Sequence, residues 1–299
     1  MSAPLPVQRA AGLTNPLGVH ALVWVGGTTP DDVATAVRQT KEAGYDLLEL
    51  SLHDATNLDV AAARAALAEA GLGVACSRGL AFDADVSSAD TTVVDRGEKL
   101  LHDSLVLTRD LGGSHLTGAL YSALGKYGQA LSAEGRANVV RVLAGLAAQA
   151  AAWDMTLGLE ICNRYETNVI NTAADALRLA DDIGADNVTI HLDTYHMNIE
   201  EDSIATPVHL VGERLGYVHV GENHRGYLGE GQIDFDTFFA ALADIAYTGP
   251  ITFESFSSAV VSPTLSVDLA IWRNLWDDGF DLATHARRYL ADGLKKHVA

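Results

Sequence analysis

Eight short apolar runs, each followed by an amphipathic stretch, constrain the fold of this chain more than any other feature. The runs are about five to seven residues long and the stretches about 12 to 20, which is the spacing of strands and helices in βα units. Near-continuous apolar strands between helices indicate a parallel sheet covered on both faces. Eight such units favour a closed (β/α)₈ barrel over an open sheet. The predicted strands are 18–24, 46–51, 73–78, 113–118, 156–161, 187–193, 216–221 and 250–255.

Helical patterns lie between these runs, and several carry end signals. Thr29-Pro30-Asp31 predicts a capped helix start, and Thr172 with Asp175 resembles a capping box. No Gly-x-Gly-x-x-Gly motif follows the first strand and no phosphate-loop motif occurs, so an open nucleotide-binding sheet lacks its signature. The predicted helices include 31–43, 57–70, 92–111, 132–152, 172–183 and 235–245.

Composition places limits on organisation and partners. No linker-like segment interrupts the pattern, so residues 17–299 are expected to form a single catalytic barrel domain, preceded by a flexible N-terminal tail over 1–16. The formal net charge of −19 disfavours nucleic acid and anionic membranes as partners. No run of about 18 apolar residues occurs. Two cysteines cannot form a disulfide framework, and a cytoplasmic location is expected.

Four consecutive predicted strands end in a side chain that can ligate a metal. These residues lie 33, 26 and 35 positions apart, about one βα unit each, and the carboxyl ends of barrel strands form the active face. Three carboxylates and one imidazole suit a divalent cation such as Mn²⁺, Co²⁺ or Mg²⁺. Close burial of three unpaired carboxylates costs several kcal/mol each unless a cation or proton compensates. The predicted ligands are Glu160, Asp193, His219 and Glu254.

Further polar residues follow three of these ligands within a few positions. Glu166, His196 and Arg225 are expected in loops at the same face of the barrel, where substrate contacts belong. Arg225 can hold a carbonyl or hydroxyl oxygen beside the metal, and Glu166 and His196 can hold sugar hydroxyls. Trp24 and Phe256 are expected to form the apolar part of the pocket.

Four longer segments resemble the ketose 3-epimerase family, which includes D-tagatose, D-allulose (D-psicose) and L-ribulose 3-epimerases and belongs to the xylose-isomerase-like TIM barrels. The likeness extends from about residue 17 to residue 290 and is greatest to the L-ribulose and D-allulose branch. The segments are 159–168 (LEICNRYETN), 191–201 (HLDTYHMNIEE), 219–226 (HVGENHRG) and 252–256 (TFESF).

The resemblance implies an activity and a set of roles. It implies that the chain interconverts free ketoses at carbon 3: D-fructose with D-allulose, D-tagatose with D-sorbose, and L-ribulose with L-xylulose. One Mn²⁺, Co²⁺ or Mg²⁺ per subunit would be held by the four predicted ligands. Glu166, His196 and Arg225 would bind the ketose near its carbonyl end. A homodimer or homotetramer is also implied, and the apolar stretch 257–280 is a candidate subunit interface.

Inversion at carbon 3 requires removal of a proton beside the carbonyl and its return from the other face. The resulting enediolate needs strong electrostatic stabilisation, which a divalent cation supplies. Glu160 and Glu254 end the fifth and eighth predicted strands, so they can approach the sugar from different sides of the barrel mouth. We expect one of them to abstract the proton and the other to deliver it, with the roles exchanged in the reverse direction.

Three alternatives remain open at the level of sequence. An aldose–ketose isomerase would use the same metal to move a proton between carbons 1 and 2. A barrel endonuclease for abasic DNA would need several metals and a basic face, which the net charge of −19 disfavours. A sugar-binding protein without catalysis is disfavoured because all the expected polar positions are present.

Overall fold

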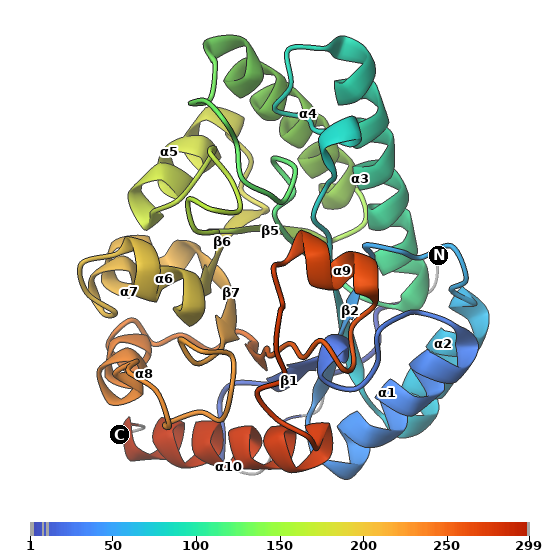
Figure 1. The fold of residues 1–299 in the computed structure, drawn as a ribbon, viewed down its shortest axis with the longest axis vertical. Coiled ribbons are helices and arrows are strands. Elements are labelled where there is room, and N and C mark those ends of the chain that lie inside the picture. Colours follow the sequence, from blue (N-terminus) through green and yellow to red (C-terminus); the bar gives the residue numbers. More distant parts are fainter. Residues whose placement is uncertain (1–2, 8, 10–11, 298–299) are drawn as a thin grey trace.

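The structure is a computed structural model and describes residues 3–7, 9 and 12–297. Within them, the strands form one closed parallel barrel in which each strand pairs with its sequence neighbours and β1 pairs with β8. The helices surround this barrel (Figure 1). The predicted (β/α)₈ architecture is therefore confirmed. The strands are β1 (Leu17–His20), β2 (Leu47–Ser51), β3 (Gly73–Ser77), β4 (His115–Gly118), β5 (Thr156–Glu160), β6 (Val188–Asp193), β7 (Leu215–Val220) and β8 (Ile251–Phe253).

The predicted helices correspond to six of the observed ones, α1 to α5 and α8. The helical patterns do not predict α6 and α7, because each spans fewer than two turns and shows no periodicity. None of the helices in the described part of the chain is long and apolar enough to cross a bilayer. The helices are α1 (Pro30–Glu42), α2 (Val60–Ala70), α3 (Thr91–Leu111), α4 (Ala133–Ala151), α5 (Ala173–Ile183), α6 (Thr194–Glu200), α7 (Thr206–Val211), α8 (Phe235–Asp244), α9 (Pro263–Asp268) and α10 (Gly279–His297).

The end signals form the expected caps. Thr29 and Asp32 make a reciprocal capping box at the start of α1, with Pro30 in its first turn. At the start of α5, the Thr172 side chain accepts a hydrogen bond from the Asp175 N–H. Such caps fix where each helix begins, and therefore how long the preceding βα loop is.

The first strand is shorter than predicted. β1 ends at His20, and the chain then turns through a 3₁₀ helix, η1 (Ala21–Val23). The turn is stabilised by His20 Nδ1, which accepts a hydrogen bond from the Leu22 N–H at 3.2 Å. When a side chain accepts a hydrogen bond from the backbone two residues ahead, that N–H is no longer available to extend the strand.

The segment before β1 contacts the barrel where the structure describes it. The Leu5 N–H donates to the Gly112 carbonyl at 2.8 Å, and the Asn15 side chain donates to the carbonyls of Tyr247 and Gly249, both at 2.9 Å. Of the predicted tail 1–16, residues 1–2, 8 and 10–11 lie outside the described residues. The flexibility of the tail stays a prediction.

The apolar stretch 257–280 packs largely against its own chain. Val261 and Leu265 are buried in a small cluster with Leu22 and Phe256, and Leu269 and Ile271 pack against that cluster. In Figure 1, α9 lies over the open end of the barrel. Part of the apolar stretch 257–280 therefore covers the barrel mouth of its own chain.

Gly158 in β5 has no room for a side chain, because an added Cβ would lie 2.4 Å from Thr117 Oγ1. We expect Gly158→Ala to lower the free energy of unfolding by about 1–3 kcal/mol through overpacking. Gly145 is the matched control: it is exposed within α4, and nothing lies within 4 Å of an added Cβ. Gly145→Ala should raise the free energy of unfolding by about 0.5–1 kcal/mol. Urea unfolding followed by circular dichroism measures both, and an unchanged midpoint for Gly158→Ala would contradict the packing described.

Candidate functional site

The carboxyl ends of β5 to β8 bring the four predicted ligands together. One potential ligand atom from each residue lies within 4.8 Å of the others. The strand register explains this, because Asp193 and His219 are direct partners across β6 and β7. Glu160 is the last residue of β5, and Glu254 immediately follows β8. From His219 Nδ1, the distances are 3.3 Å to Glu160 Oε1, 3.5 Å to Glu254 Oε1 and 3.9 Å to Asp193 Oδ2.

Two atoms of this cluster have the surroundings expected of metal ligands. Asp193 Oδ2 and His219 Nδ1 are buried, and neither has a hydrogen-bond partner among the described residues. A buried polar atom without a partner is costly, and a divalent cation between these groups would compensate both. The donor set of carboxylates and one imidazole fits Mn²⁺, Co²⁺ or Mg²⁺. The residues present therefore fit one such ion.

Without a cation, burial and mutual repulsion perturb the carboxyl groups. Burial raises the pKa of Glu160 to about 7 and that of Asp193 to about 6. Burial acts in the same direction on Glu254, but His219 and Arg225 outweigh it and hold the pKa of Glu254 below its usual range. Burial lowers the pKa of His219, yet nearby carboxylates outweigh that effect and raise it well above its usual value.

Glu49 contacts this cluster, and sequence reasoning missed it. It lies in the middle of β2, is fully buried, and accepts a hydrogen bond from His219 Nε2 at 2.8 Å. Burial by itself raises the pKa of Glu49, but His219 and His20 outweigh it and bring the pKa to about 2. The sequence did contain a signal, since a Glu among leucines in a predicted buried strand requires a partner.

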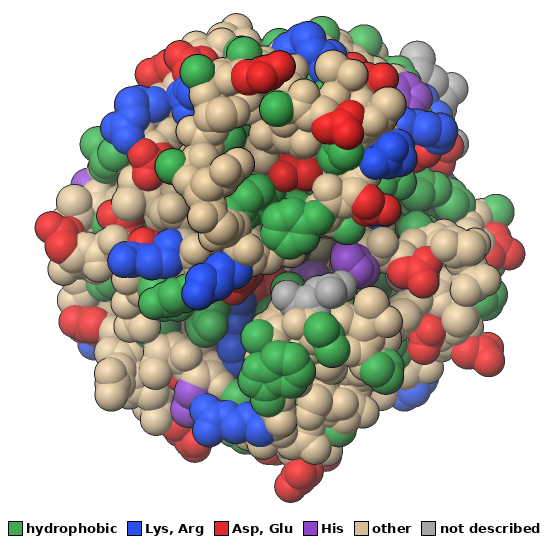
Figure 2. All heavy atoms as spheres, turned by 45° about the horizontal axis from the view of Figure 1, so that its top comes forward, with side chains coloured by type: hydrophobic (Ala, Val, Ile, Leu, Met, Phe, Trp, Pro, Cys, Tyr) green, Lys and Arg blue, Asp and Glu red, His purple; other side chains and the backbone are tan. Residues whose placement is uncertain are grey.

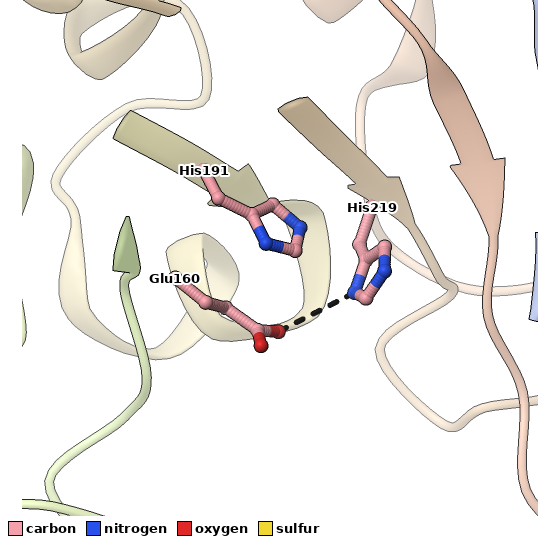
Figure 3. Close-up of side chains that lie close together, drawn as sticks. All are labelled: Glu160, His191 and His219. Carbon is pink, nitrogen blue, oxygen red and sulfur yellow. Dashed lines mark ion pairs between the residues drawn. The ribbon is translucent and has the colours of Figure 1, made fainter. Parts of the chain in front are cut away.

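His191 also lies beside the cluster. Figure 3 shows Glu160, His191 and His219 projecting from three neighbouring strands toward one another. One potential ligand atom from each of the three lies within 4.8 Å of the others. His191 lies two residues before Asp193 on β6, so it faces the same side one step deeper in the barrel. Its Nδ1 atom is 2.7 Å from Thr117 Oγ1. His191 therefore lies behind the four predicted ligands.

His196 lies at the same mouth with a defined tautomer. The Asn163 backbone N–H donates to His196 Nδ1 at 3.2 Å, so this nitrogen is an acceptor. Burial lowers the pKa of His196 to about 4. A neutral ring with Nδ1 as acceptor carries its hydrogen on Nε2, which lies 3.7 Å from Asp193 Oδ2 and 4.0 Å from Glu160 Oε1. His196 therefore presents an N–H donor to the cavity.

Arg225 is held over the cluster from several sides. Its Nη1 lies 2.6 Å from Glu254 Oε2 and 3.6 Å from Asp193 Oδ2. The guanidinium stacks on the Tyr195 and Phe256 rings, at 3.9 and 4.9 Å from their centroids. The Arg225 backbone has a φ of 60°, an uncommon conformation for a residue with a side chain. Such backbone strain is typical of functional sites.

These groups line a cavity of about 390 Å³ at the barrel mouth. Figure 2 shows this hollow with histidine side chains inside and hydrophobic side chains around it. Glu166 and Phe256 are among the residues that line it. One wall comes from residues 265–275 and includes Trp272, which is 70% exposed. The sequence did not predict a further part of the lining, which contains Ser51, His53, Ser77 and Arg78.

The position of Trp24 corrects one expectation. Trp24 is not among the described residues that line the cavity. It is buried in the main core, its indole N–H donates to Thr40 Oγ1 of α1 at 3.0 Å, and its ring lies against Phe280. The turn after His20 directs the chain away from the strand axis, so Trp24 packs beneath the outer helices.

The chain is similar to known proteins over most of its length. A family model described as the xylose isomerase-like TIM barrel matches residues 37–283. A ketose 3-epimerase from Arthrobacter globiformis is 47% identical over 278 residues, which cover 93% of this chain and 96% of the relative. An L-ribulose 3-epimerase from Methylomonas sp. (strain DH-1) is 48% identical over 273 residues, which cover 91% and 96%.

Solved structures agree with the sequence comparison. The crystal structure of a D-allulose 3-epimerase from Methylomonas sp. in complex with D-allulose superposes with a TM-score of 0.92 at 45% identity, and covers 98% of this chain and 99% of that chain. A structure of L-ribulose 3-epimerase has a TM-score of 0.92 at 42% identity and covers 95% of each chain.

Protons should compete with a cation for this cluster. Because the pKa values of Glu160 and Asp193 are raised to about 7 and about 6, both groups are protonated at pH 5 and ionised at pH 8. The protonated imidazole of His219 must also lose its hydrogen from Nδ1. We therefore expect the Kd for Mn²⁺, measured by calorimetry on chelator-treated protein, to fall by about tenfold per pH unit for each proton displaced. A Kd that is constant between pH 5.5 and 8 would contradict this account of the site.

Proposed function

This chain belongs to the ketose 3-epimerase family of xylose isomerase-like TIM barrels and is an isomerase, and we propose that it inverts carbon 3 of free ketoses with one divalent cation at its barrel mouth. The observation that carries the proposal is the cluster of four potential ligand groups within 4.8 Å, beside a largely buried arginine, Arg225. Glu160, Asp193, His219 and Glu254 would hold the ion. Mn²⁺, Co²⁺ and Mg²⁺ all suit these donors.

The difficult step is removal of a proton from a carbon next to a carbonyl. When bound, the cation would stabilise the negative charge that develops on the sugar oxygens as this proton leaves. Arg225 adds a fixed positive charge at the same place, because the Tyr195 and Phe256 rings hold its guanidinium. These groups are largely buried, which strengthens their electrostatic interactions.

Glu160 and Glu254 are proposed as the two acid–base groups. In the closed barrel their strands, β5 and β8, are separated by β6 and β7, so the two carboxylates approach the cavity from different sides. Both lie close to His219 Nδ1, at 3.3 and 3.5 Å, and therefore face a common point. One carboxylate would take the proton from one face of the sugar, and the other would return a proton to the opposite face.

Glu166, His196 and Arg225 are proposed to orient the carbonyl end of the ketose. The N–H of His196 Nε2 can donate to a sugar oxygen, and Glu166 can accept from a hydroxyl. Asn163 couples the two, because its side-chain amide donates to Glu166 Oε1 at 2.8 Å while its backbone N–H donates to His196. This arrangement would present one acceptor and one donor at a fixed separation.

The substrates proposed are the D-fructose/D-allulose and L-ribulose/L-xylulose pairs, with D-tagatose/D-sorbose as a third. The support comes from two similar proteins, an L-ribulose 3-epimerase and a D-allulose 3-epimerase in complex with D-allulose. The homodimer or homotetramer and the cytoplasmic location expected from the sequence stay predictions. Light scattering tests the first of these.

Epimerisation in D₂O distinguishes the proposed reaction from aldose–ketose isomerisation. With D-fructose and Mn²⁺, we expect D-allulose that carries deuterium at carbon 3, because the returned proton comes from a carboxyl group in exchange with solvent. Chromatography and NMR of the products identify both features. Glucose or mannose labelled at carbon 2 would instead support the isomerase.

Replacement of either proposed acid–base residue should abolish turnover. We expect Glu160→Gln and Glu254→Gln to lower kcat for D-allulose by at least about 10²–10⁴-fold, since each loses proton transfer as well as a cation ligand. Glu201→Gln is the control. Glu201 is a half-buried carboxylate that accepts from the Ala173 N–H outside the cavity, so its removal should leave kcat unchanged. Metal content is measured in parallel, and a Glu160 variant that binds metal and keeps wild-type turnover would refute the assignment.

Variants of Trp24 and Phe256 distinguish a residue of the core from a residue that lines the cavity. Trp24→Phe should lower the melting temperature, because it loses the hydrogen bond to Thr40, and should leave KM for D-allulose unchanged. Phe256→Leu removes a ring that lines the cavity and contacts Arg225, so it should raise KM severalfold. Steady-state kinetics and thermal melts of both variants make the comparison. A larger KM effect at Trp24 than at Phe256 would show that the cavity is assigned wrongly.

A further inference from the structure

Glu49 is a charged side chain at the centre of the barrel whose place the proposed reaction does not explain. It lies on β2, and its side chain has no exposed surface. β2 is separated from the predicted ligand strands by β1 on one side and by β3 and β4 on the other. A carboxylate buried this deeply costs several kcal/mol unless donors surround it. Its position therefore requires an explanation.

Two hydrogen-bond donors meet at one oxygen of this carboxylate, and a histidine ring lies near the other. His219 Nε2 lies 2.8 Å from Glu49 Oε2, and the Tyr217 hydroxyl donates to the same oxygen at 2.9 Å. His20 Nε2 lies 3.6 Å from Oε1. His20 Nδ1 already accepts from the Leu22 N–H, so in the neutral ring the hydrogen is on Nε2, which lies 3.3 Å from Ser77 Oγ as well as near Glu49. These contacts hold the carboxylate in one place.

The contact with His219 has a consequence at the opposite edge of that ring. An ionised carboxylate can only accept, so His219 Nε2 must carry a hydrogen. In a neutral imidazole, Nδ1 then has a free lone pair. This atom has no hydrogen-bond partner among the described residues and faces Glu160, Asp193 and Glu254. Glu49 thus lies on the far side of the imidazole from the predicted cation.

We propose that Glu49 is a positioning residue for the cation: it fixes the tautomer and the ring plane of His219 so that Nδ1 ligates the metal. The inference rests on the proposed cation site and extends it to a residue outside the ligand set. Tyr217 supports the arrangement in turn, because its hydroxyl is also 2.7 Å from Thr252 Oγ1, which holds the phenol in line with Glu49. Carboxylates behind a ligating histidine typically contribute 10–100-fold, as an order of magnitude, to metal affinity.

Metal titration of chelator-treated protein tests the proposal without reference to turnover. Glu49→Met removes the acceptor at similar volume, and we expect the Kd for Mn²⁺ to rise by about 10–100-fold at pH 8. Glu49→Gln keeps an amide oxygen that can accept from Nε2, so its Kd should lie between those of the wild type and Glu49→Met. The visible absorption spectrum of the Co²⁺-loaded protein should also change, since the geometry of the imidazole ligand changes. A folded Glu49→Met protein with a Kd within twofold of the wild type would overturn the proposal.

Asp85→Asn is the matched control for loss of a buried carboxylate. Asp85 is 4% exposed, and it accepts from the Tyr127 hydroxyl at 2.5 Å and from the Ser87 N–H at 2.8 Å, outside the cluster. Its replacement should lower the melting temperature and leave the Kd for Mn²⁺ unchanged. If it weakens metal binding as much as the Glu49 variants do, the effect is general destabilisation and the proposal fails.

A measurement on the wild-type protein covers the case in which no Glu49 variant folds. In Mg²⁺-loaded protein with ¹⁵N-labelled histidine, NMR should show His219 protonated at Nε2 and unprotonated at Nδ1. The reverse tautomer would overturn the inference. A wild-type protein that binds no divalent cation would instead refute the proposed cation site, so the two failures are distinguishable.

Discussion

Mutual repulsion among three carboxylates at the barrel mouth is the constraint around which the site is organised. Glu160, Asp193 and Glu254 project into one buried space, where their charges are poorly screened. The protein offers two cationic groups nearby, the Arg225 guanidinium and the His219 ring. Even so, the pKa values of Glu160 and Asp193 stay raised, to about 7 and about 6. A divalent cation would supply the charge that these groups lack.

The barrel creates this concentration of charge at low conformational cost. Parallel strands end at the same edge, so ligands separated by about thirty residues meet without long loops. The same edge carries the βα connections, in which the short helix α6 brings His196 to the cavity and loops bring Glu166 and Arg225. After β8, the chain returns as α9 and covers the mouth with apolar side chains. The predicted ligands thus come from strand ends, and the rim of the cavity comes from the connections that follow the strands.

The sequence pointed to charged residues at strand ends and missed the one in mid-strand. Glu160 and Asp193 were predictable because a charged residue at the end of an apolar run has a definite place in a barrel. Glu49 follows the same logic but lies in mid-strand, where its partner is the side chain of a distant strand. Trp24 was placed wrongly because the predicted strand continued past His20, where the backbone in fact turns. A turn stabilised by one side chain leaves no periodic signal.

The amino-acid sequence by itself determined the barrel, the order of its strands and the four strand-end side chains that lie together at its mouth, because these follow from local periodicity and from spacing along the chain. Only the tertiary structure decided which atoms face each other. The tautomer of His196 depends on the Asn163 N–H, and the contact of His219 depends on Glu49, a residue 170 positions away. Hydrogen bonds between distant strands depend on barrel closure and side-chain rotamers, and neither is encoded in a local pattern.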